Sequence, residues 1–177
     1  EALMDMKAQW IDPVAATYRG RTIHVPPPPC EAFQYLLTLR ILEGFDLARM
    51  QRNGTDHIDT VLRAIRIAAG VRIATGVPSQ QKLAELLSDG HVESLRTRVR
   101  DGKPVTGPTE QWTAPANDGH TTSFSIADRH GNMVCVTQSL GSVFGSGVVV
   151  PGTGLCLNNF LYWADVNPGG PNRVEQG

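Results

Sequence analysis

Cysteine is scarce in this sequence, and the few cysteines show no metal-binding pattern. Cys30, Cys135 and Cys156 are odd in number and far apart, whereas structural zinc sites use closely spaced pairs. Cys135 lies within an apolar run and has no histidine beside it in the sequence to activate its thiol. The five histidines are scattered as well. We therefore expect free thiols that pack as small apolar groups, and no metal, flavin or nicotinamide cofactor.

Neither an excess of charge nor a long apolar run is present. The 16 lysines and arginines nearly balance the 17 aspartates and glutamates, which gives a formal net charge of −1. This balance offers no electrostatic basis for binding nucleic acid or an anionic membrane surface. No apolar run approaches the ~20 residues of a membrane-spanning helix. The chain starts at Glu1 rather than at a methionine, so we expect a piece of a longer polypeptide.

The first half of the chain shows the apolar spacing of helices. Four consecutive prolines at residues 26–29 stop any regular element before the helices begin. The predicted segments are a helix over residues 31–42 that ends at Gly44, one that starts at Thr55 or Asp56 as its N-cap and closes at Gly76, one capped by Ser79 that carries Leu83, Leu86 and Leu87, and one over residues 92–99.

The remaining predictions for this half concern short segments, charged side chains and a linker. Residues 2–9 read as a helical remnant and residues 21–25 as an extended segment. Glu31 is expected in a first helical turn, where a carboxylate favours the helix dipole. The arginines of the fourth helix are expected on a solvated face. Residues 102–119 contain three prolines and no periodicity, which is typical of a linker.

The second half alternates with the period of strands. Residues 122–128 and 132–138 predict a hairpin, because the turn between them contains Gly131. Residues 148–150 and 155–157 predict a second, smaller hairpin. Helices followed by strands with open edges indicate an incomplete α+β domain, mostly helical over residues 1–120 and built of antiparallel strands over residues 121–177. The open edges leave pairing with another copy of the chain as an alternative.

Thr121 and Thr122 stand directly before the first strand of this hairpin. A threonine that leads a strand can serve as a nucleophile when the chain is cut in front of it, because the freed α-amine then acts as its base. That amine has an unperturbed pKa of about 7.7–8.0, close to the value wanted of a base at neutral pH. The sequence therefore indicates a latent active site opened by cleavage.

A family resemblance rests on segments from both halves. In the first half they are YRG at residues 18–20, the proline run and LRILEGFD at residues 39–46. In the second half they are Thr121-Thr122, Asp128, Gly131-Asn132, Val136-Thr137, FGSG at residues 144–147, Gly154 and LNN at residues 157–159. At these spacings the chain resembles the γ-glutamyltranspeptidases, which are N-terminal-nucleophile hydrolases with an αββα sandwich.

The resemblance implies a role for each matching position. Thr121 matches the nucleophile and the new N-terminus of the small subunit, and the His120–Thr121 bond matches the self-cleavage site. Ser139 stands where the family has a threonine whose hydroxyl supports the nucleophile's amine. The alternative for Ser139 is that it only ends a strand. The fold implied is a partial αββα sandwich.

Three positions depart from the family pattern, and all three bear on the substrate. Gly141 stands where the family has Asn, Phe160 where it has Gln, and Trp163 where it has Asp. The polar groups at these positions hold the α-amino and α-carboxylate ends of a glutamyl group. Without them an ammonium would be buried unpaired, which is costly, and the two aromatic residues favour an apolar or planar acyl group.

The resemblance implies an acyltransferase or hydrolase acting on γ-glutamyl amides such as glutathione, with water or an amine as the acceptor. One alternative is a related amidohydrolase with a non-glutamyl substrate, similar to the family's cephalosporin acylases or oxamate amidohydrolases. Another is a non-catalytic scaffold. In every case the remainder of the same polypeptide is expected to complete the site, because the family's substrate-gripping arginine and its downstream serines and glycines have no match here.

Overall fold

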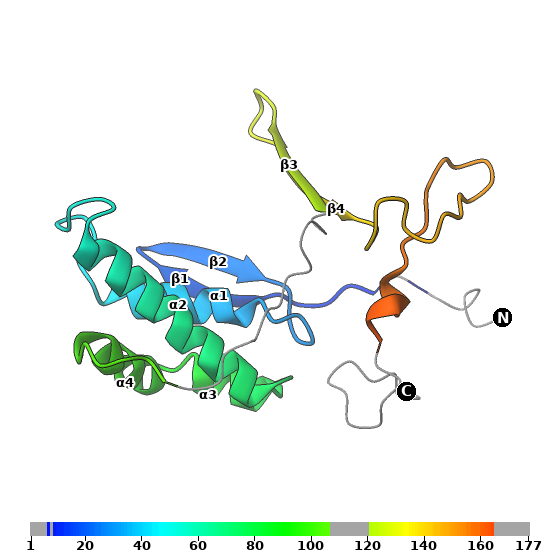
Figure 1. Ribbon diagram of the computed structural model, residues 1–177. Coiled ribbons are helices and arrows are strands. Elements are labelled where there is room, and N and C mark those ends of the chain that lie inside the picture. The colour runs from blue at the N-terminus through cyan, green and yellow to red at the C-terminus, as the bar shows by residue number, and fades with distance from the viewer. Residues whose placement is uncertain (1–6, 8, 107–120, 165–177) are drawn as a thin grey trace. The chain divides into compact units, whose positions relative to one another are not determined.

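The computed structural model describes residues 7, 9–106 and 121–164, and for Trp163 only the backbone. The chain divides into two compact units, which are Glu1–Gln111, here called the helical unit, and Trp112–Gly177, here called the hairpin unit (Figure 1). In the described part of the chain, the four helices of the helical unit and the two small antiparallel sheets, one in each unit, confirm the predicted α+β class. The functional division between residues 120 and 121 stays a prediction.

The helical unit begins with a hairpin that the sequence analysis recognised only in part. The extended segment at residues 21–25 is strand β2 (Arg21–Val25), and it pairs antiparallel with β1 (Val14–Tyr18), which was not predicted. Their two-residue turn is formed by Arg19 and Gly20 at φ 49° and 74°. Such turns are usually signalled by Asn-Gly or Asp-Gly. An arginine at the first turn position gives no such signal.

Four helices follow, and each matches a predicted segment within a few residues. They are α1 (Phe33–Glu43), α2 (Thr55–Thr75), α3 (Gln80–Leu86) and α4 (Asp89–Arg100). Helix α1 contacts β1, α2 and α4, so it is the central element of the unit (Figure 1). The main core is made of apolar side chains from α1, α2 and α4, namely Leu37, Ile41, Leu42, Ala64, Ile67, Ala68, Val92, Leu95 and Val99. Within the described residues no helix has the length and apolar character needed to cross a bilayer.

The helix ends follow the predicted chemistry with one exception. Gly44 and Gly76 occupy the C-caps of α1 and α2, and the Ser79 hydroxyl accepts a hydrogen bond from the backbone N–H of Lys82 at 3.2 Å. The predicted cap at Thr55 or Asp56 is wrong. Thr55 is the first helical residue of α2, and Gly54 is its N-cap. Glycine is nearly as good an N-cap as threonine, so propensity alone does not separate the two.

Two charged residues have roles that the sequence analysis did not assign. Glu31 precedes the N-cap of α1 instead of lying in its first turn, and its carboxylate pairs with buried Arg72 of α2 at 2.5 Å. Arg96 of α4 is not on a solvated face. Its guanidinium donates to the backbone carbonyls of Arg40 at 2.7 Å and Ile41 at 3.3 Å, near the end of α1. Both side chains therefore tie helices together.

The hairpin unit contains the predicted strands, each shifted by one residue. Strand β3 (Thr121–Ala127) pairs antiparallel with β4 (Met133–Ser139). The smaller hairpin is reduced to one bridge between Val149 and Cys156, flanked by backbone hydrogen bonds. A short 3₁₀ helix, η1 (Phe160–Trp163), follows. The predicted helical remnant at residues 2–9 lies outside the described residues except for Lys7 and Gln9, which belong to no helix or strand.

Candidate active site

The predicted nucleophile and its predicted supporting hydroxyl face each other at the open end of the β3–β4 hairpin. Thr121 is the first residue of β3 and pairs in register with Ser139, the last residue of β4. The Thr121 Oγ1 hydroxyl donates to Ser139 Oγ at 3.0 Å. Thr121 is exposed and Ser139 is half-buried. His120 lies outside the described residues, so the cleavage bond stays a prediction.

This pairing is fixed by the turn at the other end of the hairpin. The Asp128 carboxylate accepts hydrogen bonds from the backbone N–H groups of His130 at 2.8 Å and Asn132 at 2.9 Å, and from the Asn132 side-chain amide at 2.8 Å. The Asn132 hydrogen bonds hold the pKa of Asp128 below its usual range. Gly131 has φ 84°, which a side chain would disfavour. A slip of one residue would turn Thr121 to the other face.

A second group of site residues lies just after β4. The Asn159 backbone N–H donates to Leu140 O at 3.0 Å, and its side-chain amide donates to Ser142 Oγ at 3.0 Å. The Asn159 Oδ1 atom is buried and has no hydrogen-bond partner among the described residues. These bonds clamp the loop that follows Ser139 against the segment that leads into η1.

Gly141 lies within this clamp, close to another predicted site residue. Its φ is 88°, and a Cβ on it would lie 2.3 Å from Asn159 Oδ1 and 3.3 Å from the Phe160 ring. The structure thus brings Gly141, which lies two residues after Ser139, close to Phe160. Trp163 lies in η1, and its side chain is not described. Asn159 belongs to the LNN motif in the sequence, and its clamping hydrogen bonds are found only in the structure.

The glycine-rich loop at residues 144–147 is also fixed to this segment. The Ser146 backbone N–H and Oγ donate to the carbonyl oxygen of Leu157 at 2.9 and 3.1 Å. Gly145 has φ 55°, and a Cβ there would lie 2.2 Å from the same oxygen. The loop therefore needs a glycine at 145 for a close backbone approach.

The arrangement suits nucleophilic chemistry in which the threonine supplies its own base. Ser139 is the hydrogen-bonding side-chain partner of Thr121 within residues 121–164, and a serine hydroxyl is too weak a base to accept its proton outright. A free α-amine on Thr121 would be such a base. Among the described residues no group of three or more His, Cys, Asp or Glu side chains is placed to hold a metal ion.

A family model and several relatives match this chain. The family model described as "Gamma-glutamyltranspeptidase" matches residues 1–175. The acylase ACY 1 proenzyme of Pseudomonas sp. strain SE83 is 32% identical over 182 residues, covering 99% of this chain and 32% of that protein. The glutathione hydrolase proenzyme of Escherichia coli K12 is 29% identical over 178 residues, covering 97% of this chain and 31% of that protein.

A third relative is the glutathione hydrolase-like YwrD proenzyme of Bacillus subtilis strain 168, which is 29% identical over 157 residues, covering 86% of this chain and 29% of that protein. The chain spans about a third of the length of the curated relatives it matches. Because the family model matches nearly the whole chain, the protein belongs to the γ-glutamyltranspeptidase family.

Proposed function

We propose that the full-length protein is a self-processing N-terminal-nucleophile enzyme that transfers or hydrolyses the acyl group of an amide. Thr121 is the proposed nucleophile, and the His120–Thr121 bond is the proposed cleavage site. The observation that carries the proposal is the 3.0 Å hydrogen bond between the hydroxyls of Thr121 and Ser139 at the start of β3. The relatives support it, since their names describe proenzymes.

Self-processing would begin with the hydroxyl of Thr121. Its oxygen attacks the carbonyl carbon of His120, the carbon–nitrogen bond breaks, and the nitrogen of Thr121 takes up a proton to become an amine. The amide is thereby exchanged for an ester, which water hydrolyses to leave a carboxylate on His120 and a free hydroxyl on Thr121. Before this step the nitrogen of Thr121 is an amide and cannot serve as a base.

Turnover would use the same hydroxyl with the new amine as base. The amine takes the hydroxyl proton while the oxygen attacks the substrate's amide carbonyl, and the leaving amine is then protonated. The acyl group is left on Thr121 as an ester, and water or an acceptor amine removes it. Ser139 would orient the hydroxyl. The remainder of the same polypeptide would complete the αββα sandwich and supply oxyanion donors, which can be worth about 10²–10³ in rate.

Two substrate classes are candidates. The family and its glutathione hydrolase relatives point to γ-glutamyl amides such as glutathione. The closeness of Gly141 to the Phe160 ring favours the second class, which is amides with an apolar or planar acyl group. An asparagine at 141 would be strained at φ 88°, and its Cβ would lie 2.3 Å from Asn159 Oδ1, so the Asn159 side chain would have to shift to admit it.

Substitution of Thr121 in the full-length protein tests the nucleophile. Thr121→Ala should abolish both cleavage and turnover, and Thr121→Ser should retain part of each, because one hydroxyl acts in both steps. Thr122→Val is the matched control, since Thr122 pairs with Gln138 on the other face of the hairpin. Intact mass reports cleavage, and normal cleavage of Thr121→Ala would show that another residue attacks.

A substrate panel separates the remaining alternatives. A γ-glutamyl anilide and an anilide with an apolar acyl group should be compared in initial rate on the processed enzyme. A covalent mass increase on the peptide that starts at Thr121 identifies the acyl-enzyme. Processed protein that never acquires such an increase with either substrate would point to the scaffold alternative.

A further inference from the structure

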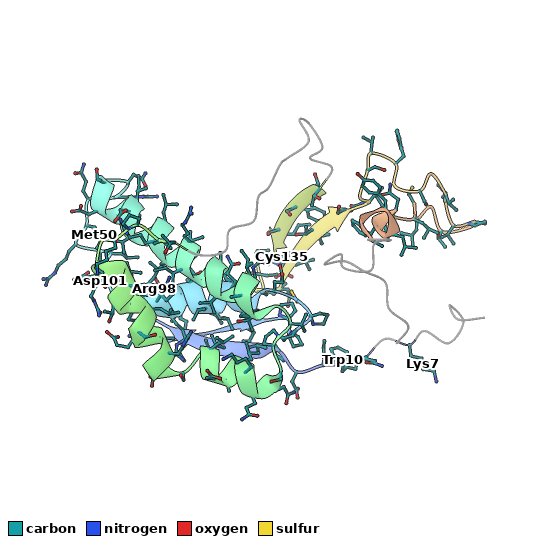
Figure 2. The ribbon with its side chains drawn as sticks, turned by 60° about the horizontal axis from the view of Figure 1, so that its bottom comes forward. Lys7, Trp10, Met50, Arg98, Asp101 and Cys135 are labelled. Atoms are coloured by element: carbon teal, nitrogen blue, oxygen red, sulfur yellow. The ribbon has the colours of Figure 1, made fainter. Side chains whose placement is uncertain are left out.

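The face of the hairpin that carries Thr121 holds a ladder of three small polar side-chain pairs. Each pair joins directly opposite residues of β3 and β4. The pairs are Thr121–Ser139 at 3.0 Å, Ser123–Thr137 at 2.9 Å and Ser125–Cys135 at 3.4 Å, here called the hydroxyl ladder. Figure 2 shows the hairpin side chains, with Cys135 of the third pair labelled.

The backbone register brings these side chains close together. The N–H of Asp128 donates to the carbonyl of Asn132 at 3.0 Å, so residues 128 and 132 form a hydrogen-bonded pair. Antiparallel pairs alternate between hydrogen-bonded and non-hydrogen-bonded types. All three ladder pairs are therefore non-hydrogen-bonded pairs, in which side chains lie closer than in the other type. The turn thus sets the spacing of every pair in the ladder.

The opposite face of the same hairpin is apolar at its centre. Its central pairs are Phe124–Val136 and Ile126–Val134. This contrast means that strand propensity does not account for the ladder, since large β-branched and aromatic residues stand at the neighbouring positions. Hydroxyl residues directly opposite each other occur only on the side that holds the proposed nucleophile, since Thr122 on the other face stands opposite Gln138.

The ladder is too widely spaced to carry protons along its length. Successive pairs are two residues apart on each strand, which is about 7 Å. That exceeds hydrogen-bonding distance, so Thr121 cannot exchange a proton directly with Ser123. The Ser123–Thr137 pair can therefore affect Thr121 only by fixing the positions of the two strands. The 2.9 Å hydrogen bond between Ser123 and Thr137 links the two strands at this pair.

We propose that Ser123 and Thr137 are positioning residues that hold the two strands and the first ladder pair in the geometry needed for attack by Thr121. This inference rests on the proposed function. Their hydrogen bond joins the strands at the pair nearest to Thr121–Ser139 on that face. Thr137 adds stiffness, because a β-branched side chain has few χ1 rotamers.

The test uses Ser123→Ala and Thr137→Val in the full-length protein. Each removes one hydroxyl, and valine keeps the branched shape of threonine. Both should slow self-cleavage and lower kcat by about 10- to 100-fold, as small misplacements of a reacting group do, and leave KM unchanged. Thr137→Ser keeps the hydroxyl and should restore most of the rate.

The double variant tests whether the two residues act as one pair. If they do, the double variant is no slower than either single variant, since neither hydroxyl has a function without the other. Independent, multiplying losses would overturn the pair. Where Thr137→Val fails to fold, as judged by its melting temperature, Ser123→Ala at its exposed position decides alone.

Ser125→Ala is the matched control, because it removes the third hydrogen bond of the ladder without touching the pair next to Thr121. Its cleavage rate and kcat should stay at the level of the unmodified protein. Equal slowing by Ser125→Ala and Ser123→Ala would show general weakening of the hairpin and would overturn the positioning role. Unchanged rates in Ser123→Ala, Thr137→Val and Ser125→Ala would also overturn the positioning role.

Thr121→Ala, measured in parallel, separates this inference from the proposed function. Cleavage of Thr121→Ala would refute the proposed function itself. An inactive Thr121→Ala variant beside fully active Ser123→Ala and Thr137→Val variants would leave the nucleophile intact and refute the positioning pair alone.

Discussion

Replacing Gly145 by alanine should loosen the loop that joins the end of β4 to η1. Two effects add. Alanine at φ 55° costs about 1–2 kcal/mol, because the left-handed region crowds a Cβ. The new Cβ would also lie 2.2 Å from the carbonyl oxygen of Leu157, so one of the two must move.

The movement would break the contacts that this oxygen makes. Leu157 O accepts from the backbone N–H and the hydroxyl of Ser146, and each such bond is worth about 1 kcal/mol net. Together with the backbone term, Gly145→Ala should destabilise the closed loop by about 3–4 kcal/mol.

Gly147→Ala provides a matched comparison. Gly147 has a similar φ of 73°, but a Cβ there would meet nothing within 4 Å. It should therefore carry only the backbone cost of about 1–2 kcal/mol. The two variants differ by about 2 kcal/mol, which is about 30-fold in the equilibrium for loop opening.

Amide hydrogen exchange in the full-length protein measures this difference directly. The Ser146 amide should exchange about 30-fold faster in Gly145→Ala than in Gly147→Ala. Self-cleavage should be slower in the same variant, since the loop follows Ser139 directly. Equal exchange at Ser146 in both variants would show that the close approach to Leu157 does not hold the loop, and the reasoning would fail.

Three further outcomes are expected. Arg96→Ala should lower the free energy of unfolding by about 1.5–3 kcal/mol in chemical denaturation, because two backbone carbonyls lose their charged hydrogen-bond donor. Arg98 is exposed on the same helix (Figure 2), so Arg98→Ala should have almost no effect. The lowered pKa of Asp128 means that its stabilisation of the turn is complete above its unfolded pKa and is lost as pH falls through the lower folded value; an NMR titration of Asp128 with a midpoint no lower than in the Asn132→Ala variant would contradict this. The 177-residue chain alone should stay uncut before Thr121 for days and release no anilide from a γ-glutamyl anilide, because it spans about a third of its relatives' length; two clean fragments by mass spectrometry, with turnover, would overturn that expectation.

The features that the sequence predicted correctly are those encoded locally. The β3–β4 hairpin follows from alternation and from a turn whose Asp128 and Gly131 each have a physical role. The pairing of Thr121 with Ser139 follows from the same turn, because each residue lies seven positions from the pair formed by residues 128 and 132. A correct turn therefore places Thr121 opposite Ser139, and their catalytic roles stay a prediction.

The features that were missed depend on contacts between distant segments. No local pattern indicates that Arg96 reaches the carbonyls of Arg40 and Ile41, since an arginine at the edge of an apolar stripe is equally compatible with solvent. The hairpin partner β1 was missed because its turn uses arginine at a positive φ. The pairing of Glu31 was missed because its partner, Arg72, lies far along the chain in α2.

The same distinction separates the two halves of the candidate site. The hydroxyl pair depends on one hairpin and its turn, whereas the region that would select the acyl group depends on a contact between Gly141 and the segment at Asn159 and Phe160. Changes in that contact leave the register of the hairpin untouched, so the proposed acyl-group selection can change while the proposed nucleophile stays in place. A Gly141→Asn substitution would be strained at φ 88°, and its Cβ would lie 2.3 Å from Asn159 Oδ1 and 3.3 Å from the Phe160 ring. A polar side chain at 141 would therefore require the Asn159 side chain and the Phe160 ring to shift with it.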